Sequence, residues 1–264
     1  MMSKTIDFSK YSSIKVGGAL SVRVIDTPEA MGDFDSHAEL RIVGYGNNLL
    51  VSPDAKNIAI LGEQYDYIHD LGDVIEAGGF VSARKLYAYF RDANLGGLEF
   101  LSALPGSLGG LVKMNAGMKA YEIKNILHSV CVDGEWQAIE DLPMGYRNSG
   151  IDGVIFAARF KKITGFDESL REVFASMRVS HPKKPSCGSC FKNPPGDFAG
   201  RLLEAVGLKG YRNGGIGFSS EHANFLVNLG KGRFEEAISL IDLAKKRVFE
   251  AYGKHLEEEV VIIR

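Results

Sequence analysis

The sequence has little of what several protein classes require. Three cysteines in 264 residues are too few for a disulfide framework and suit a reducing cytoplasm. The formal net charge of −2 offers no attraction to nucleic acid or to an anionic membrane. No stretch approaches the ~18 consecutive apolar residues of a membrane span, and the first residues carry no apolar signal core. We therefore expect a cytoplasmic protein that binds neither nucleic acid nor membrane.

Two common nucleotide-binding fingerprints are also missing. Gly44-x-Gly46 follows a candidate strand, but the third glycine of a dinucleotide motif is absent. Leu49 to Ser52 continues as a strand rather than opening a helix, and no Walker A spacing occurs. A Rossmann-type site or a P-loop is therefore disfavoured.

The overall composition is that of an ordinary globular protein, with one exception. Apolar residues make up 45% of the chain and charged residues 24%, which is typical of soluble domains. Glycine is the exception: 31 of the 264 residues are glycine, about 12% compared with an average of ~7%. The glycines cluster in short runs, which predicts tight turns and close approach of the backbone to a ligand.

Strand and helix patterns alternate along the chain, which predicts an α+β fold. Asp133-Gly134 joins two candidate strands and is a strong hairpin signal. Ser82 is a candidate N-cap, and Ala237, Leu240 and Ala244 belong to an apolar helical stripe. The expected strands are 40–43, 58–61, 130–132, 137–139, 154–160 and 260–263, and the expected helices are 81–93, 165–176, 200–206 and 234–252.

The segment 186–194 concentrates reactive side chains between prolines. Prolines predict a shaped loop or an edge strand here, and such segments often carry binding and catalysis. One interpretation makes Cys187-x-x-Cys190 a redox or metal site. The other makes Ser189 an acid–base residue, with Lys192 and Asn193 holding a substrate.

The residues around the two cysteines favour a packing role for them. A thioredoxin-like pair needs a helix after its first cysteine, and Phe-Lys-Asn-Pro cannot start one. A zinc site needs two further ligands, and Cys131, His181 and His222 are isolated in the sequence. We therefore expect Cys187 and Cys190 to be small buried residues, and no metal site.

A series of short motifs follows in a fixed order. They are Gly44-x-Gly46-x-Asn48-Leu49-Leu50, Gly97-Leu98-Glu99-Phe100-Leu101, Pro105-Gly106-x-x-Gly109-Gly110, Met114-Asn115-Ala116-Gly117, Gly145-Tyr146-Arg147-x-Ser149, Gly188-Ser189-x-Phe191-Lys192-Asn193-Pro194, Gly207-Leu208-Lys209-Gly210-Tyr211-Arg212, His222-Ala223-Asn224-Phe225 and Leu256-Glu257-x-Glu259-Val260. Over residues 11–264 the chain resembles the UDP-N-acetylenolpyruvoylglucosamine reductase (MurB) family, in its compact subclass without an extra tyrosine-bearing insertion.

The resemblance implies a fold and an activity. The fold would be α+β, with a PCMH-type FAD-binding domain of two αβ subdomains and a C-terminal α+β substrate domain. The subdomains would be residues 1–54, joined by the tail 256–264, and residues 55–164, and the substrate domain residues 165–255. The activity would be UDP-N-acetylmuramate dehydrogenase, which uses NADPH and tightly bound, non-covalent FAD to reduce UDP-N-acetylglucosamine enolpyruvate for peptidoglycan synthesis. We expect a monomer.

The resemblance also implies site residues. The cofactor-binding set would be Gly44, Gly46, Asn47, Asn48, Leu49, Pro105, Gly106, Ser107, Gly109, Gly110, Asn115, Ala116 and Gly117. The substrate-binding set would be Tyr146, Lys192, Asn193, Lys209, Tyr211, Arg212, His222 and Asn224, although His222 is equally well explained as a hydrogen-bonded core histidine.

Three residues would carry the chemistry. Arg147 would stabilise the charge that develops on the enolate and its carboxylate, and Ser189 would donate the proton. Glu259 would assist, and Glu257 is the alternative because Glu257 to Glu259 form a run of like charges. Two rival functions fit less of the sequence: a flavin-carrying domain without turnover, and a flavin oxidase, which would commonly tether its flavin through a His or Cys.

Overall fold

The computed structural model describes residues 2–33 and 40–264 and divides the chain into two compact units. The first comprises Met1–Lys4, Val22–Tyr45 and Asn57–Val179, and the second comprises Thr5–Ser21, Gly46–Lys56 and Ser180–Arg264. The α+β class is confirmed, whereas the division into three domains stays a prediction. Within the described residues, no helix is long and apolar enough to cross a membrane.

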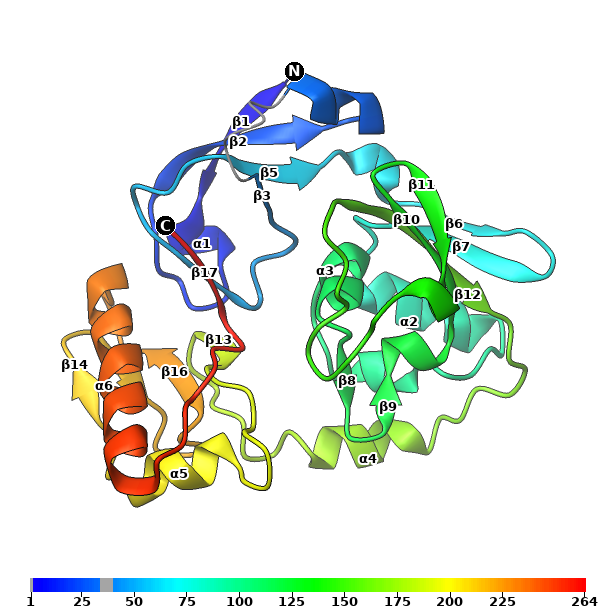
Figure 1. The fold of residues 1–264 in the computed structure, drawn as a ribbon. Helices are drawn as coiled ribbons and strands as arrows, with labels where there is room; N and C mark the ends of the chain where they lie inside the picture. Colours follow the sequence, from blue (N-terminus) through cyan, green and yellow to red (C-terminus); the bar gives the residue numbers. More distant parts are fainter. Residues whose placement is uncertain (1, 34–39) are drawn as a thin grey trace. The chain divides into compact units, whose positions relative to one another are not determined.

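The first unit is built around a five-stranded antiparallel sheet in the order β11-β10-β12-β7-β6. Its strands are β6 (Ile68–Asp70), β7 (Val74–Gly78), β10 (Leu127–Val132), β11 (Glu135–Ala138) and β12 (Ile155–Lys161). The helices of this unit are α2 (Ala83–Asp92), α3 (Leu108–Lys113) and α4 (Leu170–Ser176). Leu86 and Phe90 of α2 and Leu111 of α3 are buried in one core with Ile75 and Phe160 of the sheet. Figure 1 labels these helices and strands along the ribbon.

A second sheet has the order β1-β2-β5-β3. Its strands are β1 (Ser3–Asp7), β2 (Ala19–Ile25), β3 (Arg41–Ile42) and β5 (Ile58–Leu61), and β2 and β3 run parallel to β5. Ile25 and Leu61 form a smaller core with Phe156 and Ala157, which belong to β12. A short hairpin, β8 (Gly117–Met118) and β9 (Tyr121–Glu122), follows α3. The 3-10 turns of this unit are η1 (Pro28–Asp33), η2 (Glu63–Tyr65), η3 (Glu99–Ser102), η4 (Ile123–Asn125) and η5 (Ile139–Asp141).

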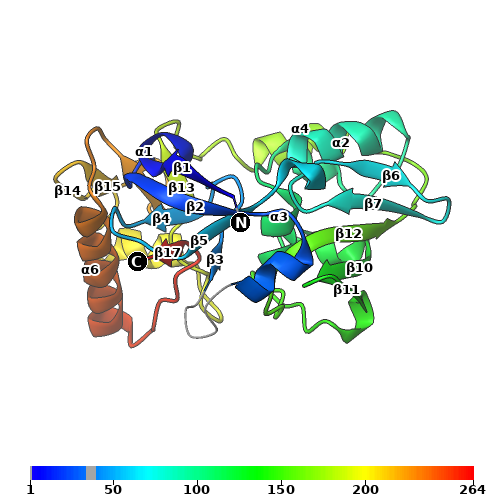
Figure 2. The same cartoon turned by 90° about the horizontal axis from the view of Figure 1, so that it is seen from above.

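The second unit packs helices on a small antiparallel sheet in the order β13-β16-β15-β14. Its strands are β13 (Ser186–Ser189), β14 (Arg212–Asn213), β15 (Ile216–Phe218) and β16 (Phe225–Asn228), and its helices are α1 (Phe8–Tyr11), α5 (Ala199–Ala205) and α6 (Phe234–Tyr252). The C-terminal strand β17 (Val261–Ile263) pairs in parallel with β4 (Leu49–Val51), beside which it lies in Figure 2.

Local sequence signals account for the elements that were predicted most sharply. The predicted helix 234–252 is confirmed, because α6 begins at Phe234 and ends at Tyr252. Its apolar stripe is buried, and Gly253 ends the helix with φ 63°. The hairpin is confirmed, since Asp133 and Gly134 both take positive φ between β10 and β11. Ser82 caps α2 by accepting a hydrogen bond from the amide of Lys85 (3.1 Å).

One helix is shorter than predicted. The pattern predicted a helix over 165–176, but α4 begins only at Leu170. Gly165 has φ 105°, and the Asp167 carboxylate accepts hydrogen bonds from the amide (2.9 Å) and hydroxyl (2.5 Å) of Ser169. This local turn competes with helix formation over the first five residues of the predicted range.

Candidate active site

Ser189 lies at the end of an edge strand whose shape depends on a glycine. Gly188 has φ 81°, a conformation that glycine adopts without strain. The pairing of β13 with β16 shifts between Ser186 and Ser189, and Ser189 lies opposite Phe225. The Ser189 side chain is half-buried, and no described residue hydrogen-bonds its Oγ atom. Of the two predicted alternatives, a shaped loop or an edge strand, the structure shows the edge strand, and the Ser189 side chain is partly accessible.

The structure brings the Glu259 segment beside the Ser189 segment. The amide of Glu259 donates to the carbonyl of Cys190 (2.9 Å), and an isolated bridge joins Phe191 to Glu258. The Asn48 side chain donates to the carbonyl of Glu259 (2.8 Å). Main-chain contacts therefore hold Glu259 next to the residue that follows Ser189.

The three glutamates of the acidic run have different surroundings. Glu257 pairs with Lys192, and its side chain is 72% exposed. Glu258 pairs with Lys245 of α6. Only Glu259 has its main chain fixed between Asn48 and Cys190, and this position favours Glu259 over Glu257 as the catalytic candidate.

Cys187 and Cys190 are fully buried in the core of the second unit. Burial raises the pKa of the Cys187 thiol to about 12 and also raises that of Cys190. Since the thiolate is the reactive form, both residues are suited to packing rather than redox chemistry. Among the described residues, no group of three or more His, Cys, Asp or Glu side chains is placed to hold a metal ion.

Arg147 occupies a strained turn in the first unit. Gly145 and Asn148 form a bridge that closes a two-residue turn over Tyr146 and Arg147. Arg147 has φ 54°, which costs a non-glycine residue roughly 1–2 kcal/mol. Its guanidinium donates to the carbonyl of Gly117 (3.0 Å) and lies 5.2 Å from the centroid of the Tyr146 ring. Such strain is typical of functional positions.

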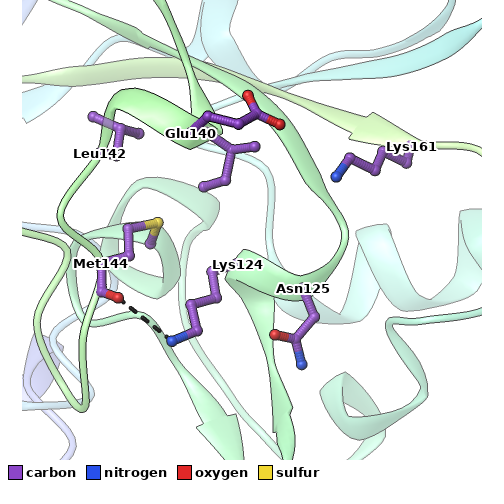
Figure 3. A pocket seen from close by; sticks show the side chains of 7 residues that line it. Lys124, Asn125, Glu140, Leu142, Met144 and Lys161 are labelled. Atoms are coloured by element: carbon purple, nitrogen blue, oxygen red, sulfur yellow. Dashed lines mark hydrogen bonds between the residues drawn. The ribbon is translucent and has the colours of Figure 1, made fainter.

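Asn115 supports this turn from within the core. It is fully buried, and its side chain donates to the carbonyl of Gly145 (2.9 Å) and accepts from the amide of Lys124 (3.3 Å). The ammonium of Lys124 reaches the carbonyl of Met144 (3.4 Å), as Figure 3 shows. The side-chain amide predicted to bind cofactor thus holds the turn that carries Arg147.

The two residues after Asn115 are also engaged within the protein. The amide of Ala116 donates to Leu111 (2.8 Å), and its carbonyl accepts from Ile123 (2.9 Å). A Cβ on Gly117 would come within 2.2 Å of the Tyr121 carbonyl. Close packing therefore explains this glycine without a ligand.

The glycine-rich loop 105–110 divides into packed and open positions. The Leu108 and Gly109 amides donate to the carbonyls of Val81 (2.8 Å) and Gly79 (2.9 Å), so these two N–H groups are unavailable to the cofactor that was predicted to bind here. A Cβ on Gly106 would meet only the Leu111 side chain, at 3.4 Å, and one on Gly110 only the Ser107 hydroxyl, at 3.4 Å. Gly106 also has φ 144°. The space beside Gly106 and Gly110 is therefore open, although the Gly110 amide itself donates to the Ser107 hydroxyl (3.4 Å).

The other predicted cofactor loop is divided between the units. Gly44 belongs to the first unit, where its Cβ would lie 2.2 Å from the Ser107 hydroxyl. In the second unit Gly46 has φ 71°, and the Asn47 side chain donates to the Ser13 hydroxyl (2.7 Å). Leu49 opens the buried strand β4. Asn47 and Asn48 thus have internal partners in addition to any ligand.

The predicted substrate residues fall into an exposed group and an engaged group. Tyr211 and Arg212 are exposed, and Lys209 pairs with the exposed Glu204 (2.9 Å). Asn193 accepts a hydrogen bond from the amide of Ala199 (3.0 Å). His222 is half-buried, with its Nδ1 accepting from the amide of Asn224 (3.2 Å), and burial lowers its pKa. Asn224 is 4% exposed.

An open pocket of about 330 Å³ lies in the first unit, on residues that sequence reasoning did not select. It is lined by Lys124, Asn125, Ile139, Glu140, Leu142, Met144 and Lys161 (Figure 3). It contains neither Arg147 nor the glycine loop, and its two lysines are accompanied by a glutamate. The pocket is linked to the turn of Arg147 through Lys124, whose ammonium donates to the carbonyl of Met144. These two residues are 20 positions apart, so no local sequence pattern indicates their contact.

Comparisons with known proteins identify relatives over the full length of the chain. Residues 181–263 match the family described as UDP-N-acetylenolpyruvoylglucosamine reductase, C-terminal domain. The chain is 57% identical to the UDP-N-acetylenolpyruvoylglucosamine reductase of Helicobacter pylori J99, over all of both chains. It is 42% identical to that of Campylobacter jejuni RM1221, over 98% of this chain and 99% of the other. The crystal structure of MurB from Thermus caldophilus superposes with a TM-score of 0.85 at 32% identity and covers all of both chains.

Proposed function

The chain belongs to the UDP-N-acetylenolpyruvoylglucosamine reductase family and performs its reductase reaction in peptidoglycan precursor synthesis, and we propose that Ser189 is its proton donor. We further propose FAD as cofactor, NADPH as co-substrate and UDP-N-acetylglucosamine enolpyruvate as substrate. The enolpyruvyl ether becomes a lactyl ether, so a hydride must reach the methylene carbon and a proton the adjacent carbon. We place the enzyme in the cytoplasm as a monomer.

The observation that carries the proposal is the position of the Ser189 hydroxyl. It is half-buried, has no hydrogen-bond partner among the described residues, and lies next to the segment of Glu259. A general acid must reach the carbon that it protonates, and a hydroxyl with no competing internal acceptor can do so. The thiols of Cys187 and Cys190 are fully buried. Ser189 is thus the best-placed donor in its strand.

Arg147 supplies the complementary charge. Negative charge develops on the carbon that is protonated and on its carboxylate, and a guanidinium can hold a carboxylate through two parallel hydrogen bonds. The turn aims this side chain by means of an unusual φ and the contact with Gly117. Glu259 is proposed to assist in shaping the enol.

The first unit fits an FAD phosphate group at the loop 105–110. Gly106 and Gly110 leave the backbone open on one side, and Pro105 and Ser107 complete the loop. Gly46, Asn47 and Asn48 are the candidates of the second unit, while Gly44 and Gly109 serve the packing of the loops. Bound FAD would supply the hydride chemistry. The protein's own residues would bind and orient FAD and the substrate, and Ser189 would supply the proton.

Six residues remain proposed substrate ligands. Lysine and arginine suit the diphosphate, and tyrosine and asparagine suit the nucleobase and acetamido edges. They are Tyr146, Lys192, Asn193, Lys209, Tyr211 and Arg212. The ion pairs of Lys192 and Lys209 involve exposed glutamates and are weak enough to exchange for a phosphate.

The test separates the two half-reactions. Ser189→Ala should retain FAD and be reduced by NADPH at the wild-type rate. Reoxidation by the enolpyruvyl substrate should fall by at least ~10²-fold, the scale of general acid catalysis. Ser189→Cys should keep part of this rate, and Cys190→Ala is the matched control that should lose little. Wild-type reoxidation by Ser189→Ala would exclude Ser189 as the donor.

A further inference from the structure

Asn224 forms an unusually complete contact with the segment that carries Ser189. Its side chain accepts a hydrogen bond from the amide of Phe191 (3.0 Å) and donates to the carbonyl of the same residue (2.7 Å). Its own main-chain carbonyl accepts from the amide of Cys190 (2.7 Å). Asn224 thereby binds three main-chain groups of the two residues that follow Ser189.

The contact with Asn224 bears on Ser189 because it fixes the main chain next to that residue. β13 is an edge strand with an irregular register, and Gly188 gives the chain rotational freedom just before Ser189. The Ser189 hydroxyl has no hydrogen bond of its own among the described residues. Its position therefore depends on the main chain: Ser189 pairs with Phe225 of β16, and on its C-terminal side Asn224 and the amide of Glu259 both bond to Cys190.

We propose that Asn224 is a positioning residue that holds the Ser189 hydroxyl in place through the main chain of Cys190 and Phe191. The proposal rests on the proposed role of Ser189 as proton donor. It replaces the sequence-based expectation that Asn224 binds substrate. A side chain that is 4% exposed, with its oxygen and nitrogen both bonded to Phe191, is poorly suited to contact a nucleobase or sugar.

The energetic reason is that proton transfer depends steeply on geometry. A displacement of about 1 Å can cost ~10²-fold in rate. Without the side-chain amide group of Asn224, the buried main-chain N–H and C=O of Phe191 lose their hydrogen-bond partners. Folded proteins avoid buried main-chain groups that lack a hydrogen bond. The segment would shift to satisfy them and carry Ser189 with it.

Asn228 provides a matched control at the end of β16, the strand that begins one residue after Asn224. It is 9% exposed, and its side chain also binds main-chain groups, donating to Ile14 and Lys15 and accepting from Gly230 and Gly232. These side-chain hydrogen bonds hold parts of the unit other than the segment of Ser189. Asn228→Ala removes a buried amide of the same kind and should lower stability without selectively slowing reoxidation.

The first readout is amide hydrogen exchange in the full-length, FAD-loaded enzyme. In Asn224→Ala, exchange at the amide of Phe191 should accelerate by about tenfold. The amide of Lys192, which donates to the carbonyl of Glu257 (2.9 Å), should change much less. Unchanged exchange at Phe191 would overturn the proposed contact.

The second readout is a double-mutant cycle on reoxidation by substrate. Asn224→Ala should slow reoxidation by ~10–10²-fold, with substrate affinity within about threefold of wild type. Adding Asn224→Ala to Ser189→Ala should slow it no further, because a positioning residue acts only through the residue that it positions. An equal additional loss in the Ser189→Ala background would overturn the inference.

A second variant keeps the test informative if Asn224→Ala folds poorly. In Asn224→Asp, only the protonated carboxyl can both donate to the carbonyl of Phe191 and accept from its amide. Burial should raise the pKa of this carboxyl. Reoxidation should therefore be near wild type at low pH and decline as the pH rises, and a pH profile parallel to that of wild type would contradict the proposal.

The two hypotheses fail in different ways. If Ser189→Ala reoxidises like wild type, the proposed donor is wrong, and the inference falls with it. If Ser189→Ala is slow but Asn224→Ala is not, the donor stands and only the positioning role is lost.

Discussion

The turn that carries Arg147 allows backbone strain to be measured separately from charge. Arg147→Ala and Arg147→Gly both remove the guanidinium and its hydrogen bond to Gly117. They differ in the cost of holding φ at 54° and in the flexibility of the unfolded chain. We expect both to lose turnover and Arg147→Gly to be the more stable of the two.

The magnitude follows from two opposing contributions. A left-handed φ costs a non-glycine residue roughly 1–2 kcal/mol, and glycine escapes this cost. Glycine in turn makes the unfolded chain more flexible, which costs about 0.4–1 kcal/mol. The difference is about 1 kcal/mol in favour of Arg147→Gly, or a melting temperature about 2–4 °C higher for a chain of this length.

Melting of the two variants, followed by circular dichroism at equal FAD concentration, checks this sign. Arg84 is a control position, since it is exposed within α2, and there Gly should be less stable than Ala by about 1 kcal/mol. If Arg147→Ala melts at or above Arg147→Gly while the Arg84 pair behaves as expected, the turn does not hold Arg147 in the left-handed region. The argument for stored strain would then fail.

Three further outcomes are expected. Cys187 and Cys190 should resist Ellman's reagent at pH 8 in the native protein and react on unfolding, because burial raises the pKa of both thiols; rapid native labelling would contradict a packing role. Gly110→Ala should melt no lower than wild type, since alanine favours a helix, but should retain less FAD on gel filtration, because its Cβ would occupy the open side of the loop; full retention would remove Gly110 from the cofactor site. Burial lowers the pKa of His222, so the unfolded chain binds the proton more tightly, and the free energy of unfolding should fall as the pH drops below about 6.5. In urea titrations, His222→Asn should make the free energy of unfolding less dependent on pH. An unchanged pH dependence in this variant would contradict the assignment to His222.

Local signals predicted the elements whose conformation is decided by neighbouring residues. Asp133-Gly134 tolerates positive φ and therefore sets the β10–β11 turn. The stripe from Ala237 to Val248 buries one face of α6. The helix predicted over 165–176 was too long because the Asp167 side chain forms a competing turn, an interaction that periodicity does not report.

The candidate site was predicted by motif order rather than by local physics. Ser189, Arg147 and Glu259 are separated by tens of residues, and no periodicity relates them. The cofactor role of Asn115 and the substrate role of Asn224 stay predictions. Both belong to motifs of the family, yet in the structure their side chains bind protein main chain, at Gly145 and at Phe191.

The sequence by itself determined the fold class, the family and the residue types available for chemistry, because these depend on composition, local conformation and motif order. Tertiary structure decided how each of those residues is buried and bonded. Glu257 and Glu259 are chemically identical, but one pairs with Lys192 at the surface and the other is held between Asn48 and Cys190. Gly106 and Gly109 look alike in the sequence, but the amide of Gly109 is bonded to Gly79, whereas a Cβ on Gly106 would meet only one flexible side chain. Burial and hydrogen-bond partners come from segments distant in the chain, and only folding brings those segments into contact.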